Sequence, residues 1–186
     1  MRLKYNAPVV LTFTLLCAAI LLLSRTLFPN LAEYLFMVPG RDHFSIKSLR
    51  NILSIITHVF GHADWTHLIS NFTLILLIGP MLEAKYSSKN LLLMMLITAF
   101  VTGVLNIILF KSALMGASGI VFMMILLSSF TNFSHGEIPV TFILVLILYL
   151  GVQILESFQA DNISQFAHIV GGLCGSVFGF LKPPKE

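Results

Sequence analysis

The residue best placed to do chemistry in this sequence is a serine, Ser118, in the stretch MGASGI. Gly116, Ala117 and Gly119 surround it, so a reacting group can approach its hydroxyl closely. A serine hydroxyl becomes an effective nucleophile when a base removes its proton. His168, in the stretch QFAHIVGGLCG, can act as that base if its imidazole is neutral. We therefore expect acyl-transfer chemistry from a serine and a histidine.

A second polar stretch, HADWTHLISN, supplies donors for the oxyanion that such a reaction forms. His67 and Asn71 are four residues apart, which puts both side chains on one face of a helix. Their side-chain N–H groups, with the backbone N–H of Ser118, can stabilise the negative oxygen of a tetrahedral intermediate. Because no acidic residue is positioned to orient His168, the sequence predicts a Ser–His dyad rather than a triad.

The composition of the chain places these residues in a membrane. Of its 186 residues, 57% are hydrophobic and 10% are charged, and the mean hydropathy is +0.94. Soluble domains carry about 25% charged residues, so this chain cannot cover a surface that faces water. Its net charge of +3 suits contact with anionic lipid better than binding to nucleic acid.

Six stretches of the chain contain no Asp, Glu, Lys or Arg, and each is 18 to 24 residues long. About 20 apolar residues cross a hydrocarbon core of about 30 Å, and their backbone groups must be hydrogen-bonded internally. We therefore predict an all-α membrane protein, a bundle of six transmembrane helices in a single domain over residues 1–186. The predicted spans are 7–27, 65–83, 90–110, 115–133, 138–156 and 164–181.

The direction of these spans brings the polar residues together. His67, Ser118 and His168 each fall near the start of the second, fourth and sixth span, so they lie in one leaflet at similar depth. Gly171 and Gly175 are four residues apart on the face of the sixth span that carries His168. Such small-residue stripes let transmembrane helices pack closely. We expect the small-residue start of the fourth span to be the partner, which would bring His168 to Ser118.

The three polar stretches resemble the signatures of the rhomboid intramembrane serine proteases. HADWTHLISN, GASG and AHIVGGLCG stand in the order of that family, and the resemblance covers about residues 57–180. It implies a six-helix fold of rhomboid type in its minimal form, without an extra cytoplasmic domain. It also implies a serine endopeptidase, with no cofactor and no metal, that cleaves transmembrane segments near the membrane surface.

The resemblance also assigns roles to individual residues. It makes Ser118 the nucleophile and His168 the base. His67 and Asn71 match the pair that stabilises the oxyanion, and Gly116 matches the first glycine of the GxSG motif.

Further residues take supporting roles. Phe122, one turn after the serine, matches the aromatic residue that packs beside the catalytic histidine. We expect His58 and His62 to form structural hydrogen bonds near the interface rather than to take part in catalysis. The fifth span and the loop Ser157–Gln165 would form the gate and the cap over the site.

The first loop, Pro29–Thr57, departs from the pattern of the family. Its apolar sequence is broken by Lys47 and Arg50, which favours a segment lying along the membrane interface. Many members carry a Trp-Arg pair shortly before the second span, whereas this chain has Leu53 and Ser54. The departure concerns the structure of the loop and leaves the dyad intact.

Two other functions fit parts of the sequence. One is a non-catalytic rhomboid-like protein that binds membrane clients, although such relatives lack the serine or the histidine that this chain has. The other is a membrane protein with a metal bound by His58, His62 and His67. HExxH is absent, and no nearby carboxylate or cysteine completes a clear ligand set.

The orientation follows from the distribution of positive charge. An even number of spans puts both termini on one side, with Arg2, Lys4, Lys85, Lys89, Lys182 and Lys185. The positive-inside rule then favours cytoplasmic termini. We expect a multi-pass protein of the plasma membrane whose partners are transmembrane protein substrates and the lipid bilayer.

Overall fold

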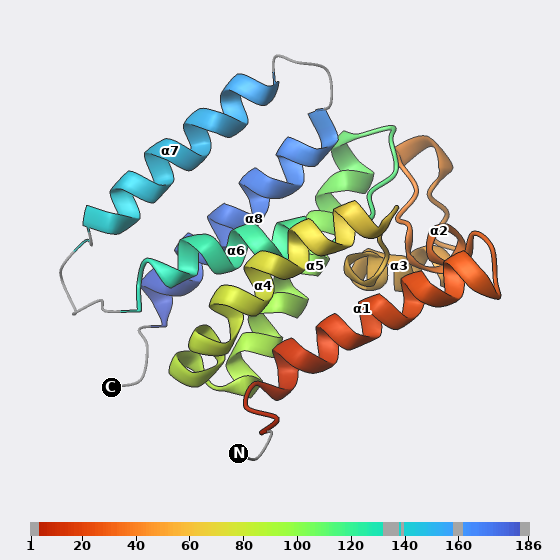
Figure 1. The fold of residues 1–186 in the computed structure, drawn as a ribbon. Coiled ribbons are helices and arrows are strands. Elements are labelled where there is room, and N and C mark those ends of the chain that lie inside the picture. The colour runs from red at the N-terminus through yellow and green to blue at the C-terminus, as the bar shows by residue number, and fades with distance from the viewer. Residues whose placement is uncertain (1–3, 132–137, 139, 158–161, 183–186) are drawn as a thin grey trace.

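The computed structural model of the chain describes residues 4–131, 138, 140–157 and 162–182, of which 149–157 and 162–164 are described by backbone only. Figure 1 shows a helical bundle. Its elements are α1 (Pro8–Thr26), α2 (Leu31–Phe36), η1 (Arg41–His43), α3 (Leu49–Thr57), η2 (His58–Phe60), α4 (Trp65–Tyr86), α5 (Ser88–Leu109), α6 (Ser118–Ser128), α7 (Val140–Ser157) and α8 (Asn162–Leu181). Among the described residues, the β-structure is a single bridge between Val38 and Leu114.

Among the residues that the structure describes, three helices are long and apolar enough to cross a membrane. α1, α4 and α5 have 19, 22 and 22 residues, with mean hydropathies of 2.1, 1.4 and 2.4. At 1.5 Å per residue they reach about 28–33 Å, which matches the hydrocarbon core. The prediction of a helical membrane protein is therefore confirmed, and the number of six crossings stays a prediction.

The helix described within the predicted span 115–133 is shorter than that span, and residues 132 and 133 lie outside the described residues. α6 has 11 residues, and at about 17 Å it is too short to cross the hydrocarbon core alone. The residues directly before it are not helical, and hydrogen bonds to other segments hold them. Leu114 and Val38 exchange two backbone hydrogen bonds of 2.9 Å, and Asn106 Nδ2 donates to the carbonyl of Ser112 at 3.1 Å. These bonds delay the start of the helix to Ser118.

A buried carboxylate joins three helices at the end of the bundle where the chain begins. Glu83 of α4 is 5% exposed and accepts hydrogen bonds of 3.0 Å from both Val9 N–H and Val10 N–H. It also accepts one of 2.6 Å from the hydroxyl of Ser88, the first residue of α5. A negative charge at a helix N-terminus satisfies N–H groups that have no partner within the helix. Glu83 thereby fixes the start of α1 against the turn between α4 and α5.

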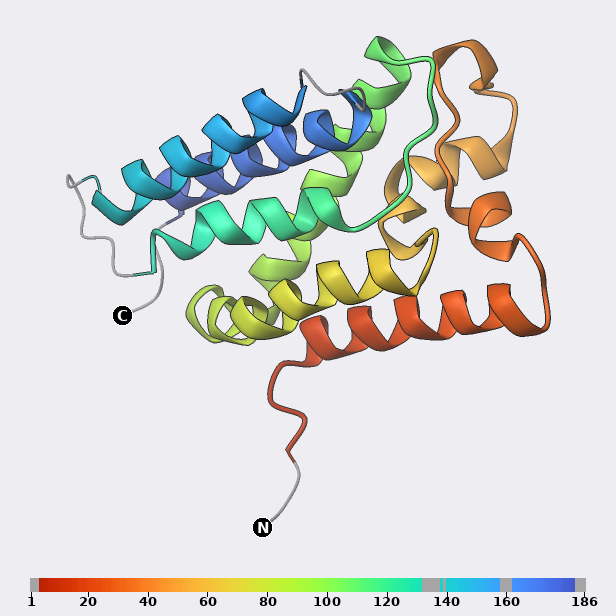
Figure 2. The ribbon, with the colours of Figure 1, turned by 45° about the horizontal axis from the view of Figure 1, so that its top comes forward.

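The last helix returns to the same end. Lys182 Nζ, directly after α8, donates to Asn90 Oδ1 in the first turn of α5 at 2.7 Å. The start of α1 and the end of α8 therefore lie at one end of the bundle, as Figures 1 and 2 show. The even number of crossings that we predict requires this arrangement.

Glycines bring α6 and α8 into direct backbone contact. A Cβ atom at Gly171 would lie 2.1 Å from the carbonyl oxygen of Gly119, and one at Gly175 would lie 2.2 Å from that of Met123. Any side chain at these positions would push the helices apart. Figure 2 shows α6 lying along α8, with α7 on the other side of α8. The predicted small-residue packing between these two helices is therefore present.

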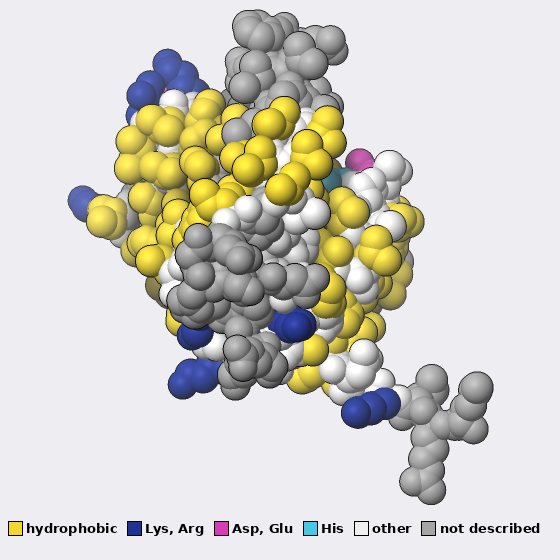
Figure 3. All heavy atoms as spheres, turned by 90° about the vertical axis from the view of Figure 1, so that its left-hand side faces the viewer, with side chains coloured by type: hydrophobic (Ala, Val, Ile, Leu, Met, Phe, Trp, Pro, Cys, Tyr) yellow, Lys and Arg dark blue, Asp and Glu magenta, His cyan; other side chains and the backbone are white. Residues whose placement is uncertain are grey.

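The first loop turns its apolar side outward. On α3, Leu49 and Leu53 are 69% and 55% exposed, whereas Asn51 and Ser54 are 4% and 1% exposed. A helix that hides polar residues and shows leucines suits contact with lipid rather than water. Hydrophobic side chains likewise cover much of the described surface in Figure 3.

Local bonds hold this loop without the Trp-Arg pair. The hydroxyl of Ser54 donates to the carbonyl of Asn51 at 2.8 Å. The guanidinium of Arg50 lies over the ring of Tyr34, 4.7 Å from its centroid, and so joins α3 to α2. A Cβ atom at Gly103 of α5 would lie 2.3 Å from the carbonyl oxygen of Ile55, so α3 also packs directly on the backbone of α5.

Candidate active site

Ser118 is the first residue of α6 and is half-buried. Gly116, two residues earlier, has φ of +134°, a conformation that glycine adopts without strain. Its N–H donates to the carbonyl of His58 at 3.0 Å, which ties the approach to the helix onto η2. The first N–H groups of a helix have no intrahelical acceptor and form the positive end of its dipole. The serine hydroxyl therefore lies where a developing negative charge is favoured.

His168 lies on the turn of α8 that faces the first turn of α6. Its ring packs against Phe122, with ring centroids 4.1 Å apart and planes at 37°. On either side of His168, Ala167 and Gly171 both contact Gly119: a Cβ on Gly119 would lie 3.3 Å from the carbonyl oxygen of Ala167. The structure thus places the histidine beside Phe122, on a part of α8 whose backbone contacts the first turn of α6.

His67 approaches the same place from α4. A Cβ atom at Gly116 would lie 2.7 Å from Cε1 and 2.9 Å from Nε2 of the His67 ring. The imidazole therefore occupies the space beside Gly116 that a larger residue would fill. It is also close enough to His168 for their charges to interact. Asp64 caps α4 by accepting the N–H of His67 at 2.7 Å, which sets where the helix starts.

Asn71 follows His67 by one turn of α4 and is 6% exposed. Its Nδ2 is enclosed and has no hydrogen-bond partner among the described residues. A buried donor without an acceptor costs about 1–3 kcal/mol, so such a group is uncommon unless something else binds it. An oxygen that arrives with a substrate would satisfy this amide.

His62 packs behind His67. The two rings meet edge to face with centroids 5.0 Å apart, and His62 meets Phe72 in the same way at 5.6 Å. His62 is 1% exposed, and neither ring nitrogen has a hydrogen-bond partner in the described part of the chain. Burial lowers the pKa of His62 to about 4, so its ring is neutral near pH 7.

His58 connects α5 to the loop before α6. Its Nε2 lies 3.1 Å from the carbonyl oxygen of Ala99 and 3.4 Å from the hydroxyl of Thr102. Burial lowers the pKa of His58 to about 4. His58 and His62 do not share a helical turn, because η2 ends at Phe60 and the chain is extended at Gly61. These contacts support the structural role expected of His58.

Three polar residues of α5 were missed in the sequence. Thr98, Thr102 and Asn106 are four residues apart and are at most 1% exposed. Thr102 contacts His58, and Asn106 holds the segment before α6. Their spacing within an apolar helix was the available signal, since polar groups on one face of a transmembrane helix usually meet other polar groups.

Two other expectations concern metal and gating. Among the described residues, no group of three or more His, Cys, Asp or Glu side chains is arranged to hold a metal ion. Of the loop Ser157–Gln165, which with the fifth span is predicted to form the gate and the cap, residues 158–161 lie outside the described residues. His67 of α4 contacts Gly116 just before α6, and His168 of α8 contacts Phe122 in α6, so both imidazoles lie near the first turn of α6.

Comparison with known proteins gives the family. The family model of the rhomboid domain matches residues 49–185, which include all of the site residues described above. The match begins at α3 and leaves α1 and α2 outside.

Two curated relatives are similar over most of this chain. Rhomboid protease GlpG of Haemophilus influenzae is 22% identical over 182 residues, which are 96% of this chain and 93% of that protein. The chloroplastic rhomboid-like protein 11 of Arabidopsis thaliana is 25% identical over 168 residues, which are 81% of this chain and 60% of that longer protein. The chain is an integral membrane protein that belongs to the rhomboid family.

Proposed function

We propose that the chain is an intramembrane serine endopeptidase that uses Ser118 as nucleophile and His168 as base. Membership of the rhomboid family and similarity to a rhomboid protease support proteolysis in the membrane. The observation that carries the residue assignment is the backbone contact between α6 and α8. Gly171 and Gly119 touch, which supports a position of His168 beside the first turn of α6.

In the proposed reaction, neutral His168 takes the proton of Ser118 Oγ as this oxygen attacks the carbonyl carbon of the scissile peptide. The carbonyl oxygen becomes an oxyanion, for which His67, Asn71 and the backbone N–H of Ser118 are the donors. When the tetrahedral intermediate collapses, the C–N bond breaks and His168 gives the proton to the leaving amine. Water then attacks the acyl-enzyme by the same route and releases the acid product.

The geometry of the donors supports this assignment. Asn71 holds a buried amide that no described residue satisfies, and His67 presses against Gly116 beside the serine. A donor that is already in place before the charge develops is worth about 3–4 kcal/mol in the transition state. Phe122 packs on one face of the His168 ring and restricts its orientation.

The proposed substrate is a transmembrane segment of another membrane protein, and the termini of the chain are proposed to be cytoplasmic. The end of the bundle that holds Lys4, Lys89 and Lys182 would then face the cytoplasm. Reporter fusions at residues 4 and 182 would give cytoplasmic signals for both if six crossings are present. Signals on opposite sides would contradict the topology while leaving the dyad untouched.

The decisive experiment combines cleavage and covalent labelling. Ser118→Ala and His168→Ala should each lower cleavage of a transmembrane test substrate by at least about a thousandfold. A fluorophosphonate should label the parent chain and fail to label Ser118→Ala. Ser176→Ala is the matched control, because the Ser176 hydroxyl bonds only within α8, to the carbonyl of Gly172 at 2.9 Å.

The results separate the proposed function from its main alternative. Full cleavage by a folded Ser118→Ala variant would remove the serine from the mechanism. Binding of transmembrane segments without cleavage or labelling in the parent chain would identify a client-binding protein instead.

A further inference from the structure

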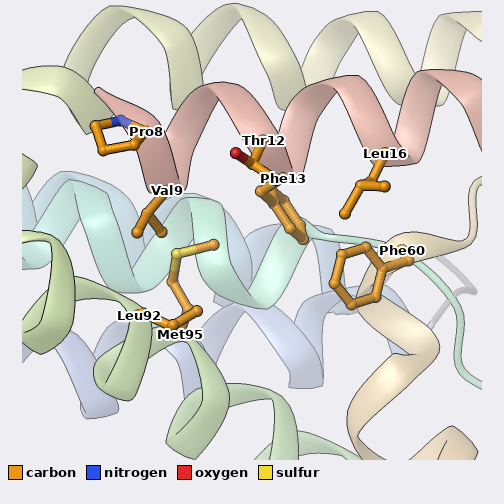
Figure 4. A pocket seen from close by; sticks show the side chains of 8 residues that line it. All are labelled: Pro8, Val9, Thr12, Phe13, Leu16, Phe60, Leu92 and Met95. Carbon is orange, nitrogen blue, oxygen red and sulfur yellow. The ribbon is translucent and has the colours of Figure 1, made fainter. Parts of the chain in front are cut away.

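A cavity of about 320 Å³ opens between α1, α5 and η2, away from the residues proposed for catalysis. Seven of its eight lining residues are apolar. They are Pro8, Val9, Thr12, Phe13, Leu16, Phe60, Leu92 and Met95, and Figure 4 shows their side chains around the open space. The rings of Phe13 and Phe60, 5.1 Å apart, form one wall. We call this cavity the α1–α5 groove.

The inner end of the α1–α5 groove leads toward the back of the candidate site. A smaller cavity of about 30 Å³ shares Phe13, Phe60, Leu92 and Met95 with it. Ala99 and Ile120 complete its far side. The carbonyl of Ala99 is the partner of His58, and Ile120 is two residues after Ser118. The side chains shared by the two cavities therefore lie between the groove and the residues around the start of α6.

The occupant of the groove must come from the membrane. α1 and α5 both have the length and hydropathy of membrane spans, so the groove between them faces hydrocarbon. Leu16 and Leu92, on its two sides, are 48% and 44% exposed, so the groove is open to lipid.

The size of the α1–α5 groove indicates what kind of molecule can occupy it. An α-helix with its side chains is about 10–12 Å wide, whereas an acyl chain is much thinner and adapts its shape to an irregular groove. The groove therefore suits an acyl chain, and a helix of a second copy is the alternative that the test below separates. A methylene group is about the size of a water molecule, about 30 Å³, so the groove has room for about ten methylenes of one acyl chain.

The charges at one end of the α1–α5 groove indicate which lipid headgroup it would bind. Lys89 is one turn before Leu92 on α5 and is exposed, and Lys4 is exposed just before α1. The hydroxyls of Tyr5 and Thr12 bond each other at 3.0 Å at the same end of α1. The nearby carboxylate, Glu83, is buried and is occupied by Val9, Val10 and Ser88. The accessible charges at this end of the groove are therefore positive.

We propose that the α1–α5 groove binds one anionic phospholipid. One acyl chain lies between α1 and α5 as far as Phe60, and the phosphate lies between Lys89 and Lys4. The bound chain fills the space under η2 and so supports His58 from the side opposite the site.

The test measures lipid binding by native mass spectrometry of the full chain in detergent, titrated with phosphatidylglycerol or phosphatidylcholine. The parent chain should bind one phosphatidylglycerol before other lipids, and more tightly than phosphatidylcholine. Lys89→Gln should weaken phosphatidylglycerol binding by about fivefold and leave phosphatidylcholine binding unchanged. Leu92→Trp, which fills the groove, should remove the first bound lipid of either kind.

Matched controls separate this site from general lipid contact. Leu93→Trp changes the next residue of α5, which is exposed and does not line the groove, and Lys111→Gln removes an exposed lysine at the other end of that helix. Both should bind as the parent does. If Leu92→Trp does not fold, Leu16→Trp fills the groove from α1.

Three results would overturn the proposal. They are equal binding of both lipids by the parent chain, parent-like binding by folded Lys89→Gln and Leu92→Trp, and equal losses in the control variants. A dimer that Leu92→Trp dissociates would show that a second copy covers the groove, and would also overturn it. None of these measurements depends on cleavage, so they remain valid if the proposed protease activity is wrong.

Discussion

The contact between α6 and α8 and the contact between α1 and α5 are built from opposite kinds of residue. α6 and α8 meet through glycines, and their backbones touch at Gly119 and Gly171. α1 and α5 face each other across long side chains such as Leu16 and Met95, which leave a cavity of about 320 Å³. A backbone contact permits one arrangement, whereas side chains around a cavity permit several. The residues proposed for catalysis thus lie on the less adjustable of these two contacts, and the other leaves space.

The largest effect is expected from adding a side chain to the backbone contact between α6 and α8. Gly171→Val places a Cβ atom 2.1 Å from the carbonyl oxygen of Gly119, so α8 must move away from α6. We expect at least a hundredfold loss of cleavage, because a shift of about 1 Å at a reacting group costs that much. Destabilisation by about 1–3 kcal/mol should accompany it, measured by thermal unfolding in detergent.

Leu173→Val is the control for this change, since Leu173 is 54% exposed on the lipid side of α8. It should cleave within twofold of the parent rate. Parent-like cleavage by Gly171→Val would show that the contact is more adjustable than its geometry indicates.

The second prediction separates the effect of Asn71 on cleavage from its effect on the stability of the fold. Asn71→Leu removes an enclosed amide that no described residue satisfies. Cleavage should fall by about 100- to 1,000-fold in kcat, because an oxyanion donor is lost. The free energy of unfolding should stay the same or rise by about 1 kcal/mol, because a buried unpaired donor is also lost.

The neighbouring Ser70→Leu, on the exposed side of α4, should change neither quantity appreciably. A large fall in stability for Asn71→Leu would mean that the amide has a structural partner, and the oxyanion role would then be unsupported.

The third effect concerns His58 and His62, which lie between the two contacts. Burial lowers the pKa of each from 6.5 to about 4. Between about pH 6.5 and pH 4 the unfolded chain binds protons that the folded chain does not, so stability falls as the pH falls through this range. The loss should reach about 3 kcal/mol for each histidine by about pH 4, and none of it should appear above about pH 7.

Thermal unfolding in detergent from pH 4 to pH 8 measures this dependence. His58→Gln should make the curve flatter, and the same change at the exposed His43 should leave it unaltered. A flat curve for the parent chain would show that both rings accept protons without cost, and that the space around them is wet.

The smallest effect is expected at the contact between α1 and α5. Leu16→Ala shortens a side chain that is 48% exposed and lines the α1–α5 groove. We expect a loss of about 1 kcal/mol or less and cleavage within twofold of the parent. Ile75→Ala, at a fully buried position of α4, should cost about 2–5 kcal/mol by comparison. Equal costs for the two variants, measured in the same unfolding assay, would remove the contrast.

Local features of the sequence were enough to predict several elements. Runs without charge predicted membrane helices, because a charged residue is costly in hydrocarbon wherever it lies in the fold. The glycine spacing of Gly171 and Gly175 predicted a close contact for α8, since the period of four residues is a property of the helix itself. The Ser–His pairing was also predicted this way and remains a prediction for experiment.

Features that depend on distant partners could not be predicted. The start of α6 at Ser118 could not be predicted, because the residues from Ser112 to Gly116 are as apolar and uncharged as a helix would be. Their non-helical conformation is held by hydrogen bonds to Val38, Asn106 and His58, which lie in other elements. The α1–α5 groove was equally hidden, since a cavity arises from how side chains fail to fill a space and leaves no residue pattern.

The hydrogen bonds of Glu83 indicate what would happen if the chain were truncated before residue 49. The family model matches from residue 49 and leaves α1 outside, whereas the similarity to rhomboid protease GlpG covers 96% of this chain. Glu83 accepts two N–H groups of α1 at 3.0 Å, so a chain cut at residue 49 would leave this buried carboxylate with Ser88 as its partner among the described residues. A fragment that begins at the family-model boundary should therefore be less stable at the end of the bundle where α1 starts.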